Sequence, residues 1–440
     1  MSNTFSSRLG FILSSAGSAI GLGCIWKFPY MATQHGGGAF FLVYLALALT
    51  LGLALMSAEM ALGRASGQGV CGAFSSLGSK RWRYCGYLPV ATAFVIMGFY
   101  CVVGGWSLAY VFKALAGQAV SQDAALLTER FNTLIAHPAQ AILWLAGFLG
   151  LTALVVLGGV QRGIEMMSRK LMPLLFILML LLIARGITLP GAWEGVIFLL
   201  RPDFSAFSFN TLLAALGLAF FSLSLGMGAM VTYGAYLKAD SDLPGAAAWV
   251  VALTLFVCLL GGLLVVPPAF ALGIGPQGGP GLTFISMPAI FASMPGGELF
   301  AVLFFVLLLV AALTSSVSLL EVCARFAIDE LGLSRRMAVL ASSAGIFVLG
   351  VPAALSFSPE NTLSLLGHTA FDLMDQLTSN IMLPLGGIAT AVFCGWFCWR
   401  EIGAQLRYRN RARRSLLAAT RIIVALVAPL AISVILLRGA

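Results

Sequence analysis

Eleven apolar segments follow one another along this chain, and each is long enough to cross a lipid bilayer. A transmembrane helix needs about 20 predominantly apolar residues, and helices pair all their backbone polar groups inside lipid. The segments lie approximately at 8–30, 39–63, 86–116, 139–159, 168–188, 208–237, 243–273, 297–328, 336–355, 371–400 and 418–437. Only 9% of the 440 residues are charged, against roughly 25% in soluble domains. The sequence therefore predicts an all-α polytopic membrane protein with one transmembrane domain, residues 1–440.

Basic residues gather in every second connection between these segments. The connections after even-numbered segments hold Arg64, Lys80, Arg81, Arg83, Arg162, Arg169, Lys170, Lys238, Arg335, Arg336, Arg400, Arg407, Arg409, Arg411, Arg413 and Arg414. The other connections hold only Lys113, Arg130, Arg185 and Arg201. Because cytoplasmic loops carry an excess of Lys and Arg, we expect a cytoplasmic N-terminus and an extracellular C-terminus. The basic run at 400–414 is expected to contact anionic membrane lipid and no nucleic acid.

Paired glycines interrupt the first and the sixth segments. Gly21 and Gly23 lie in the first, and Gly226 and Gly228 lie in the sixth. Because glycine costs about 1 kcal/mol relative to alanine inside a helix, these pairs predict two helices that are broken at mid-depth. Non-helical backbone at that depth persists only where it is buried in protein or lines a wet cavity. The pattern is typical of a transporter whose substrate and ion sites lie between two halves of the molecule.

Longer motifs resemble those of one transporter family. They are Arg8–Leu13, Gly17–Tyr30, Gly36–Phe40, Glu59 with Gly63 and Arg64, Tyr100 with Trp106, Phe220–Gly226, Phe284–Phe291, Leu313–Ser316 and Asp372–Asp375. They are similar to motifs of the neurotransmitter:sodium symporters, in particular of the bacterial eleven-span branch. The resemblance implies the LeuT fold, with inverted five-helix repeats at 1–188 and 208–400, helices 1 and 6 broken, and an extra helix at 418–437. It also implies a multi-pass protein of the bacterial inner membrane.

The resemblance implies two sodium sites, of which one is intact. The ligands of the second site would be the carbonyl groups of Gly17, Ile20 and Ala311 and the hydroxyls of Thr314 and Ser315. The ligands of the first would be Ala19, Cys24, Ser222 and Thr254. Cys24 and Thr254 replace two asparagines of the family, and a neutral thiol is a poor ligand for Na⁺. We therefore expect one Na⁺, at the second site, although water could complete the first. From the residues alone, the hydroxyls of Thr314 and Ser315 more often bond back to their own helix.

The same resemblance argues against chloride coupling. Chloride-dependent relatives have a Gln and a Ser where this chain has Leu218 and Cys258. Tyr44 and Ser222 remain, but they provide too few donors for an anion. The Glu that chloride-independent bacterial relatives carry at the position of Cys258 is also missing.

A substrate site follows from the resemblance. Its residues would be Ser18, Ala19, Gly21, Leu22, Gly23, Ile96, Tyr100, Val103, Phe221, Ser222, Ser224, Met227, Ser315 and Leu319. Gly21 replaces the aspartate with which amine transporters of the family pair an ammonium group, so an α-amino acid is favoured. The amides of Leu22 and Gly23 would receive its carboxylate at a half-helix N-terminus, with the Tyr100 hydroxyl. Met227 gives an adaptable apolar wall, which favours a bulky hydrophobic or aromatic substrate.

Residues on either side of this site match the gates of the family. Lys27 and Asp375 match the extracellular gate, with Phe221 beside the substrate. The cytoplasmic gate would consist of Tyr233, Tyr236, Asp329 and the tail residue Phe5. The tail lacks the arginine that normally pairs with the gate aspartate, and only Arg8 lies nearby.

Other functions remain open at this stage. The substrate could be a neutral aromatic or an amine compound without a carboxylate, because loss of the first sodium leaves a carboxylate less well compensated. A proton-coupled permease of the same fold could use Glu321 or Glu59, although Glu59 is expected to bond the freed backbone of the broken helices. A receptor or scaffold would bind ligand without transport. An enzyme is not expected, since the three histidines lack metal-ligand spacing and no catalytic triad is evident.

Two further expectations concern a loop and the assembly. The connection at 275–297 has Gly and Pro at both ends of an apolar centre, and we expect this centre to pack against the helices. The protein is expected to be a monomer or a weak homodimer.

Overall fold

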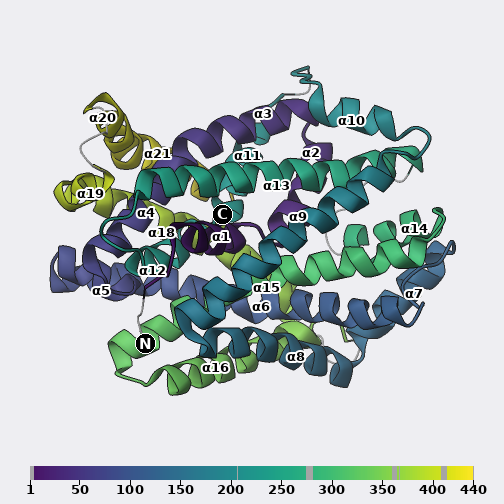
Figure 1. Ribbon diagram of the computed structural model, residues 1–440, viewed down its shortest axis with the longest axis horizontal. Coiled ribbons are helices and arrows are strands. Elements are labelled where there is room, and N and C mark those ends of the chain that lie inside the picture. Colours follow the sequence, from purple (N-terminus) through teal and green to yellow (C-terminus); the bar gives the residue numbers. More distant parts are fainter. Residues whose placement is uncertain are drawn as a thin grey trace.

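The computed structural model describes residues 4–205, 207–273, 281–358, 364–365, 367–407 and 414–439 (Figure 1). Up to residue 200 its elements are α1 (Arg8–Ala19), η1 (Gly23–Lys27), α2 (Phe28–Gln34), α3 (Gly38–Leu47), η2 (Ala48–Gly52), α4 (Leu53–Ser66), α5 (Val70–Leu77), η3 (Lys80–Trp82), α6 (Arg83–Leu115), α7 (Ala124–Ala136), α8 (Pro138–Leu157), η4 (Val160–Glu165), α9 (Met166–Gly186) and α10 (Ala192–Leu200). The elements that follow are α11 (Phe209–Ser222), α12 (Ala229–Ala235), α13 (Leu243–Ala271), η5 (Leu282–Ser286), α14 (Met287–Ala292), α15 (Gly297–Leu331), α16 (Arg335–Leu355), β1 (Ser364–Leu365), β2 (His368–Thr369), α17 (Ala370–Gln376), η6 (Leu377–Met382), α18 (Leu383–Val392), η7 (Phe393–Phe397), α19 (Trp399–Leu406), α20 (Arg414–Ile422), η9 (Ile423–Val427) and α21 (Ala428–Gly439).

The predicted membrane-spanning segments are all present as helices. Within the described residues, nine helical stretches are long and apolar enough to cross a membrane on their own. A tenth span is α1 together with η1 and α2, which are bent by 53° at the break. The sixth predicted segment forms the two shorter helices α11 and α12, separated by residues 223–228. The third and eighth segments form longer helices than predicted, and α15 continues to Leu331.

The break in the sixth segment depends on glycine. Gly226 and Gly228 have φ angles of +78° and +76°, in a region that residues with a Cβ rarely adopt. A Cβ on Gly226 would also lie 2.6 Å from the carbonyl oxygen of Leu383. Glu59 holds the unwound backbone as predicted, because its Oε1 accepts a 2.8 Å hydrogen bond from the Gly226 N–H.

The break in the first segment needs glycine for space. The helix ends at Ile20, whose ψ of 82° leaves the helical region, whereas neither Gly21 nor Gly23 has a positive φ. A Cβ on Gly21 would lie 2.4 Å from the Ser315 Oγ, and one on Gly23 would lie 2.8 Å from the Phe221 ring. Both glycines therefore let neighbouring helices approach the break.

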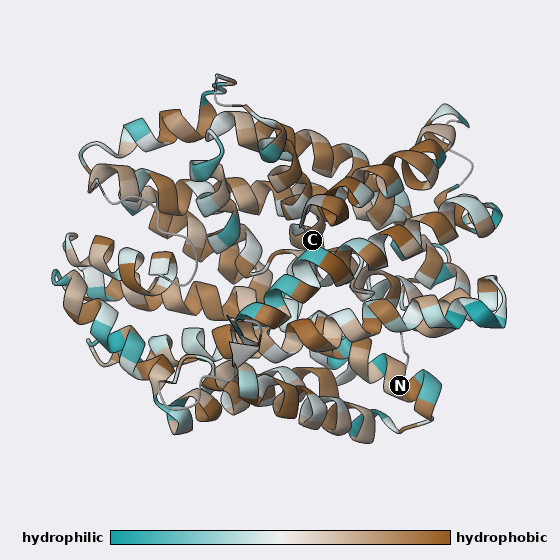
Figure 2. Cartoon of the chain, turned by 180° about the vertical axis from the view of Figure 1, so that it is seen from behind, coloured by the Kyte–Doolittle hydropathy of each residue, from teal (hydrophilic) through white to brown (hydrophobic). Residues whose placement is uncertain are grey.

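The helix α15 is central to the packing. It contacts α1, α6, α8, α9, α12 and α16, and Figure 1 shows α15 and α6 side by side, with α8 and α16 next to them. Hydrophobic residues predominate along the long helices, whereas strongly hydrophilic residues lie mainly toward helix ends and connections (Figure 2). Large apolar side chains such as Leu154 and Leu430 are exposed on the outer surface. This distribution fits helices that face lipid.

The connection at 275–297 packs against the helices as predicted. Residues 275–280 lie outside the described part of the chain, but Phe284 and Phe291 are buried. The ring of Phe284 lies 5.0 Å from that of Tyr110 and 5.1 Å from that of Phe131. Aromatic pairs at such distances stabilise the contact beyond the apolar area that they bury.

A short hairpin precedes the tenth span. β1 pairs with β2 in antiparallel register, with Ser364 opposite Thr369 and Leu365 opposite His368. Thr369 then caps α17, because its side chain accepts a hydrogen bond from the Asp372 N–H. Of the basic run at 400–414, residues 408–413 lie outside the described residues.

Candidate functional site

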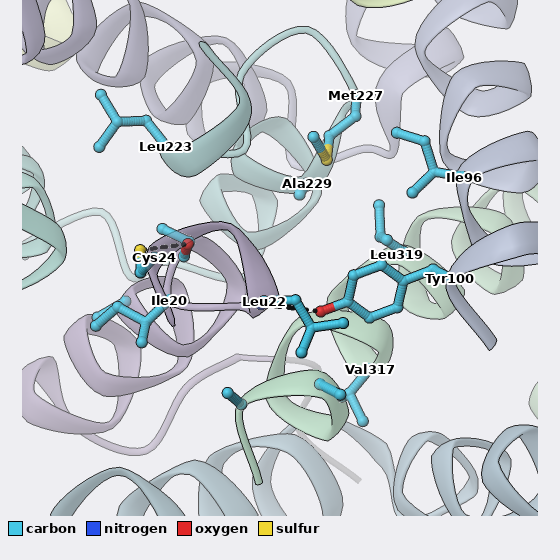
Figure 3. Close-up of a cluster of buried hydrophobic side chains, with 14 of the residues drawn as sticks. Ile20, Leu22, Cys24, Ile96, Tyr100, Leu223, Met227, Ala229, Val317 and Leu319 are labelled. Carbon is cyan, nitrogen blue, oxygen red and sulfur yellow. Dashed lines mark hydrogen bonds between the residues drawn. The ribbon is translucent and has the colours of Figure 1, made fainter. Parts of the chain in front are cut away.

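A cavity of about 30 Å³ lies where the two broken helices meet α6 and α15. Its lining residues are Ser18, Ala19, Gly21, Leu22, Gly23, Ile96, Tyr100, Phe221, Ser222, Ser224, Met227, Ser315 and Leu319. The structure thus brings together every predicted substrate residue except Val103, which lines a neighbouring cavity of about 330 Å³. Figure 3 shows Leu22, Ile96, Tyr100, Met227 and Leu319 around one space.

One end of this cavity is polar. The Leu22 N–H donates a hydrogen bond of 3.5 Å to the Tyr100 hydroxyl (Figure 3). The Ser224 hydroxyl donates to the Ser18 carbonyl at 3.0 Å, and the Ser315 hydroxyl donates to the same carbonyl at 3.0 Å. Hydroxyls from α15 and from the α11–α12 break therefore meet the end of α1. These groups are buried, so a polar ligand there would be bound without competition from bulk water.

The rest of the cavity is apolar. Ile96 comes from α6, Leu319 from α15 and Met227 from the α11–α12 break. The Phe221 ring lines this cavity and also the neighbouring 330 Å³ cavity. Phe221 therefore lies between the inner cavity and the larger outer one, together with Leu22, Gly23 and Tyr100, which also line both. The distribution of polar and apolar groups suits a ligand with one charged end and an apolar side chain, and the cavity of about 30 Å³ would have to widen to admit it.

The residues of the predicted second sodium site lie together. The Ser315 hydroxyl donates to the Gly17 carbonyl at 3.2 Å, across two helices. The Thr314 hydroxyl bonds back to the Ala311 and Val310 carbonyls at 3.0 and 3.1 Å. A Cβ on Gly17 would lie 3.3 Å from the Thr314 Cβ, so α1 and α15 are in close contact here. The donor set is entirely neutral oxygen, which suits a hard monovalent cation.

The Ile20 carbonyl is also part of that predicted set. Ile20 is fully buried, and it lies at the first residue outside the regular geometry of α1. A carbonyl group at such a helix end has no intrahelical N–H partner. Ile20 therefore presents the kind of oxygen that the second sodium site requires.

Of the predicted first sodium site, Cys24 and Ala19 contact each other, whereas Ser222 and Thr254 bond to other residues. The Cys24 thiol lies 3.8 Å from the Ala19 carbonyl oxygen, and the Thr254 hydroxyl donates to the Val250 carbonyl of its own helix at 2.9 Å. The Ser222 hydroxyl is bonded to the Tyr44 hydroxyl at 2.8 Å. These oxygen and sulfur atoms thus already have protein partners.

Of the two predicted chloride positions, Cys258 belongs to the same network and Leu218 does not. The Tyr44 hydroxyl lies 3.2 Å from the Cys258 thiol as well as 2.8 Å from the Ser222 hydroxyl. Leu218 is buried and lines a third cavity of about 280 Å³ between α11, α18 and α21. The polar groups beside Leu218 therefore satisfy one another, and an anion would have to displace those bonds.

The predicted extracellular gate residues face the same cavity without forming an ion pair. Lys27 and Asp375 both line the 330 Å³ cavity. The Lys27 ammonium lies over the Phe221 ring, 4.7 Å from its centroid, and Asp375 accepts a 3.0 Å hydrogen bond from the Ser379 hydroxyl. The described residues contain no Lys27–Asp375 ion pair. The Lys27 ammonium is therefore attracted to the Phe221 ring, and it does not pair with the Asp375 carboxylate as predicted.

The cytoplasmic gate contains the predicted aromatic residues. Phe5 is buried, and its ring makes edge contacts with Phe11 at 5.3 Å and Tyr233 at 5.7 Å. The Phe5 N–H donates to the Tyr236 carbonyl at 3.0 Å. Asp329 does not join this cluster through the tyrosines, because it accepts hydrogen bonds from Arg325 at 2.7 Å and from the Gly69 N–H at 2.8 Å.

Two arginines of this gate were missed by the sequence interpretation. Arg325 lies four residues before Asp329 on α15, a helical spacing that brings the side chains together. Arg335 pairs with the fully buried Glu321 at 2.6 Å and also donates to the Val156 carbonyl. The Tyr236 hydroxyl donates to the same carboxylate at 2.6 Å. Glu321, predicted as a possible titrating group, is thus one partner of a buried ion pair.

Glu165 was also missed, although it is an acidic residue in a basic connection. Its carboxylate accepts hydrogen bonds from the Ser6 N–H at 2.7 Å, the Ser6 hydroxyl at 2.6 Å and the Ser7 hydroxyl at 3.1 Å. It therefore fixes the tail that carries Phe5. The signal was a single Glu flanked by Arg162 and Arg169.

Comparisons with known proteins extend over the whole chain. The model of the Sodium:neurotransmitter symporter family matches residues 2–133 and 125–438. The sodium-dependent transporter YhdH of Bacillus subtilis is 38% identical over 438 residues, which cover 99% of this chain and 97% of that protein. The creatine transporter of Torpedo marmorata is 26% identical over 364 residues, which cover 71% of this chain and 58% of that protein.

A solved structure agrees with the fold. The crystal structure of MhsT in complex with L-phenylalanine has a TM-score of 0.91 to this structure at 39% sequence identity, and the match covers 100% of both chains. This match confirms the predicted LeuT fold with its broken first and sixth helices.

Proposed function

This chain belongs to the sodium:neurotransmitter symporter family, and from that premise we propose that it imports a bulky hydrophobic or aromatic α-amino acid together with Na⁺ by alternating access. Relatives of this chain are sodium-dependent transporters, and its helices make it a multi-pass membrane protein. The observation that carries the proposal is the central cavity. It has a polar end at Leu22 and Tyr100 and apolar walls at Ile96, Met227 and Leu319.

The polar end of the cavity suits an α-carboxylate. Leu22 precedes the second half of the broken helix, where free N–H groups and the helix dipole attract an anion. The Tyr100 hydroxyl, which already meets the Leu22 N–H, can donate to the same carboxylate. Gly21 lines the cavity without an acidic side chain, so an amine without a carboxylate would have no charged partner there.

The position of the substrate ammonium group is inferred from the carbonyls and hydroxyls that line the rest of the cavity. An ammonium group would lie near the Ala19 and Phe221 carbonyls and the Ser224 and Ser315 hydroxyls, since these residues line the same cavity. The apolar walls would receive the side chain. MhsT, which shares the fold, was solved with L-phenylalanine, and we extend that ligand class to this chain.

The proposed ion is a single Na⁺ at the second site. Its ligands would be the Gly17, Ile20 and Ala311 carbonyls with the Thr314 and Ser315 hydroxyls. The hydrogen bond between the Ser315 hydroxyl and the Gly17 carbonyl supports this choice, because it brings oxygens of α1 and α15 together, and a cation would take the place of that hydrogen bond while the hydroxyl keeps its proton and turns away. The ion would connect α1 to α15, which couples its binding to the arrangement of those helices.

Neither a second Na⁺ nor chloride is part of the proposal. Cys24 and Thr254 stand where the family has two asparagines, and the thiol of Cys24 is too soft a ligand for Na⁺. Ser222 and Tyr44 bond each other, and Leu218 offers no donor to an anion. A neutral aromatic or amine substrate without a carboxylate remains the alternative, because one Na⁺ compensates less charge than two.

Proton coupling is less well supported by the contacts. Glu321 is held by Arg335 and Tyr236, which stabilise the carboxylate. Glu59 is engaged with the Gly226 N–H through one oxygen, while its Oε2 has no hydrogen-bond partner among the described residues. Glu59 is therefore the residue to examine if uptake proves independent of Na⁺.

A ligand comparison tests the substrate class. The thermal stability of the purified protein would be measured with phenylalanine, phenethylamine and ethylbenzene, each in Na⁺ and in choline, because a ligand that binds the folded state raises the melting temperature. We expect phenylalanine to stabilise the protein in Na⁺ only, and the two other compounds to have little effect. Equal or better stabilisation by ethylbenzene would overturn the amino-acid assignment.

The Tyr100→Phe variant tests the carboxylate contact directly. Loss of a hydrogen bond to a charged group should weaken phenylalanine binding by about 1.5 to 3 kcal/mol. Thr92→Val is a matched control, because the Thr92 hydroxyl bonds the Leu88 carbonyl of α6 and lies outside the cavity lining. Unchanged phenylalanine affinity in Tyr100→Phe would contradict the proposed carboxylate position.

The setting of the protein is proposed from the same resemblance. We place it in a bacterial inner membrane with a cytoplasmic N-terminus and an extracellular C-terminus, as a monomer or weak homodimer. Residues 1–188 and 208–400 would form the two inverted repeats, with 418–437 as an additional helix.

A further inference from the structure

Two buried thiols from distant parts of the chain face each other. Cys24 comes from η1 in the first broken helix and Cys258 from the middle of α13, and both side chains are fully buried. The two thiols lie within hydrogen-bonding reach of each other. Their elements are in close contact, because a Cβ on Gly261, three residues after Cys258, would lie 2.3 Å from the Cys24 carbonyl oxygen. The thiol pair therefore joins a broken helix to a continuous one.

The groups around the two sulfur atoms are polar but neutral. The Tyr44 hydroxyl lies 3.2 Å from the Cys258 sulfur and 2.8 Å from the Ser222 hydroxyl. The Cys24 thiol lies 3.8 Å from the Ala19 carbonyl oxygen (Figure 3). Both sulfurs thus have neutral hydrogen-bond partners. A dry site of this kind suits a bound complex that carries little net charge.

The sulfur atoms determine which cation the site suits. Thiols and thiolates are soft ligands that select soft cations such as Cu(I) and bind Na⁺ poorly. Zinc sites use three or four protein ligands, whereas no group of three His, Cys, Asp or Glu side chains converges in the part of the chain that the structure describes. Two sulfurs instead suit a soft monovalent cation, which two-coordinate sulfur ligation can satisfy.

A monovalent cation also balances the charge of the pair. When it binds, the S–H bond of one thiol breaks, the proton goes to water, and two metal–sulfur bonds form. The complex of one cation, one thiolate and one thiol is neutral, and the metal keeps its oxidation state. The Tyr44 hydroxyl is close enough to donate to the Cys258 sulfur, which would stabilise a thiolate there.

The thiol pair lies directly behind the lining of the central cavity. Gly23 and Ser222 both line that cavity. Gly23 precedes Cys24 in the chain, and the Ser222 hydroxyl bonds the Tyr44 hydroxyl that reaches Cys258. A cation in the central cavity is therefore separated from the two sulfurs by one layer of residues.

We propose that Cys24 and Cys258 together bind one soft monovalent cation, such as Cu(I) or Ag(I). The metal would bridge η1 to α13 and so hold the second half of the first broken helix on α13. Two features of the site support this assignment, namely the contact between the thiols and the neutral hydroxyls around them. The binding requires only the folded chain and is independent of the transported substrate and its ions.

Silver binding to the purified full-length protein tests the proposal. Ag⁺ is the probe because it is soft, monovalent and stable in one oxidation state, and it would be supplied as its glutathione complex in chloride-free buffer. Glutathione competes for silver at single cysteines, whereas a preformed pair retains the metal because both ligands are already in place. Bound silver would be counted by mass spectrometry after gel filtration. We expect at least one equivalent per chain, and a higher melting temperature with silver.

Serine variants locate the bound silver. Cys24→Ser and Cys258→Ser should each bind one equivalent less than the wild type, because the site needs both sulfurs. Cys101→Ser/Cys323→Ser is the matched control, since both thiols are buried but lie on α6 and α15, and it should keep the wild-type count. Silver at the Cys394–Cys398 contact would be the same in all these proteins, so it cancels in the difference.

Melting temperatures without silver would show which variants are folded. Cys24→Ala and Cys258→Ala provide a second pair of substitutions, in case a serine hydroxyl disturbs the packing between η1 and α13. A wild type that takes no silver from glutathione would overturn the proposal. So would a wild-type silver count in either folded single variant, or an equal loss of silver in the Cys101→Ser/Cys323→Ser control.

Discussion

At the scale of single residues, the same side-chain type has different roles that only the partners reveal. Thr314 and Thr254 are both buried threonines that bond back to carbonyls of their own helices. Thr314 is followed by Ser315, whose hydroxyl reaches the Gly17 carbonyl on α1. Thr254 lies instead beside the thiol-containing network of Tyr44 and Cys258. The two threonines thus provide a matched pair for a test of the ion site.

Removal of the two α15 hydroxyls should abolish the response to Na⁺. In Thr314→Ala/Ser315→Ala the proposed ion loses two of its five ligands, so Na⁺ should no longer stabilise the protein or support amino-acid uptake. Thr254→Ala should retain both responses. The measurements are melting temperature and radiolabelled uptake against Na⁺ concentration. Uptake that keeps its Na⁺ dependence in the double variant would place the ion elsewhere.

At the scale of elements, the cytoplasmic gate shows which contacts a sequence predicts and which depend on packing. The motif positions of Phe5, Tyr233 and Tyr236 correctly predicted an aromatic cluster. The motifs gave no acidic partner for Tyr236, because Glu321 and Asp329 lie two turns apart on α15 and either could face a tyrosine. Arg325 satisfies Asp329 locally, which leaves Glu321 to Tyr236. Such competition between partners depends on three-dimensional packing.

The buried ion pair between α15 and α16 should be more costly to break than to remove. Glu321→Gln leaves the Arg335 guanidinium, which is 26% exposed, without its carboxylate, and loss of one partner of a buried pair costs about 3 kcal/mol. Glu321→Gln/Arg335→Gln should recover part of that loss. The melting temperature of each purified variant gives the order. A double variant less stable than either single variant would contradict this expectation. It would mean that Glu321 and Arg335 each stabilise the protein through contacts other than the ion pair.

The tail should be released when its serine hydroxyls are removed. Ser6→Ala/Ser7→Ala deletes two of the three hydrogen bonds to Glu165 and also the cap that the Ser7 hydroxyl provides to the Gly10 N–H of α1, so hydrogen–deuterium exchange in residues 4–12 should increase. Arg8→Gln is the control, because it breaks an ion pair with Asp242 in which the arginine side chain is 48% exposed, and such pairs contribute about 0–1 kcal/mol. Equal exchange in the serine variant and the wild type would show that the two serine hydroxyls do not hold the tail.

At the scale of the whole molecule, the sequence was most informative about properties that do not change during transport. The apolar segments, the broken helices and the lining of the central cavity were all predicted, because hydropathy, glycine spacing and family motifs are the same in every conformation. The ion pair between Lys27 and Asp375 was not found, since the ammonium lies over the Phe221 ring. The distance between two gate residues differs from one conformation of an alternating-access cycle to the next. A sequence encodes every conformation of the cycle, so it does not predict the distance in one of them.

The ion requirement of the whole transport cycle provides the last test. Chloride replacement by gluconate at constant Na⁺ should leave amino-acid uptake unchanged, because Leu218 provides no donor and the Tyr44 hydroxyl is already bonded to Ser222 and near Cys258. Uptake should depend on Na⁺ with a Hill coefficient near one, as expected for one coupled ion. Choline replacement of Na⁺ provides the negative control. A Hill coefficient near two would require a second Na⁺ despite Cys24, and a reproducible loss of uptake in gluconate would require an anion site built from groups that now bond one another.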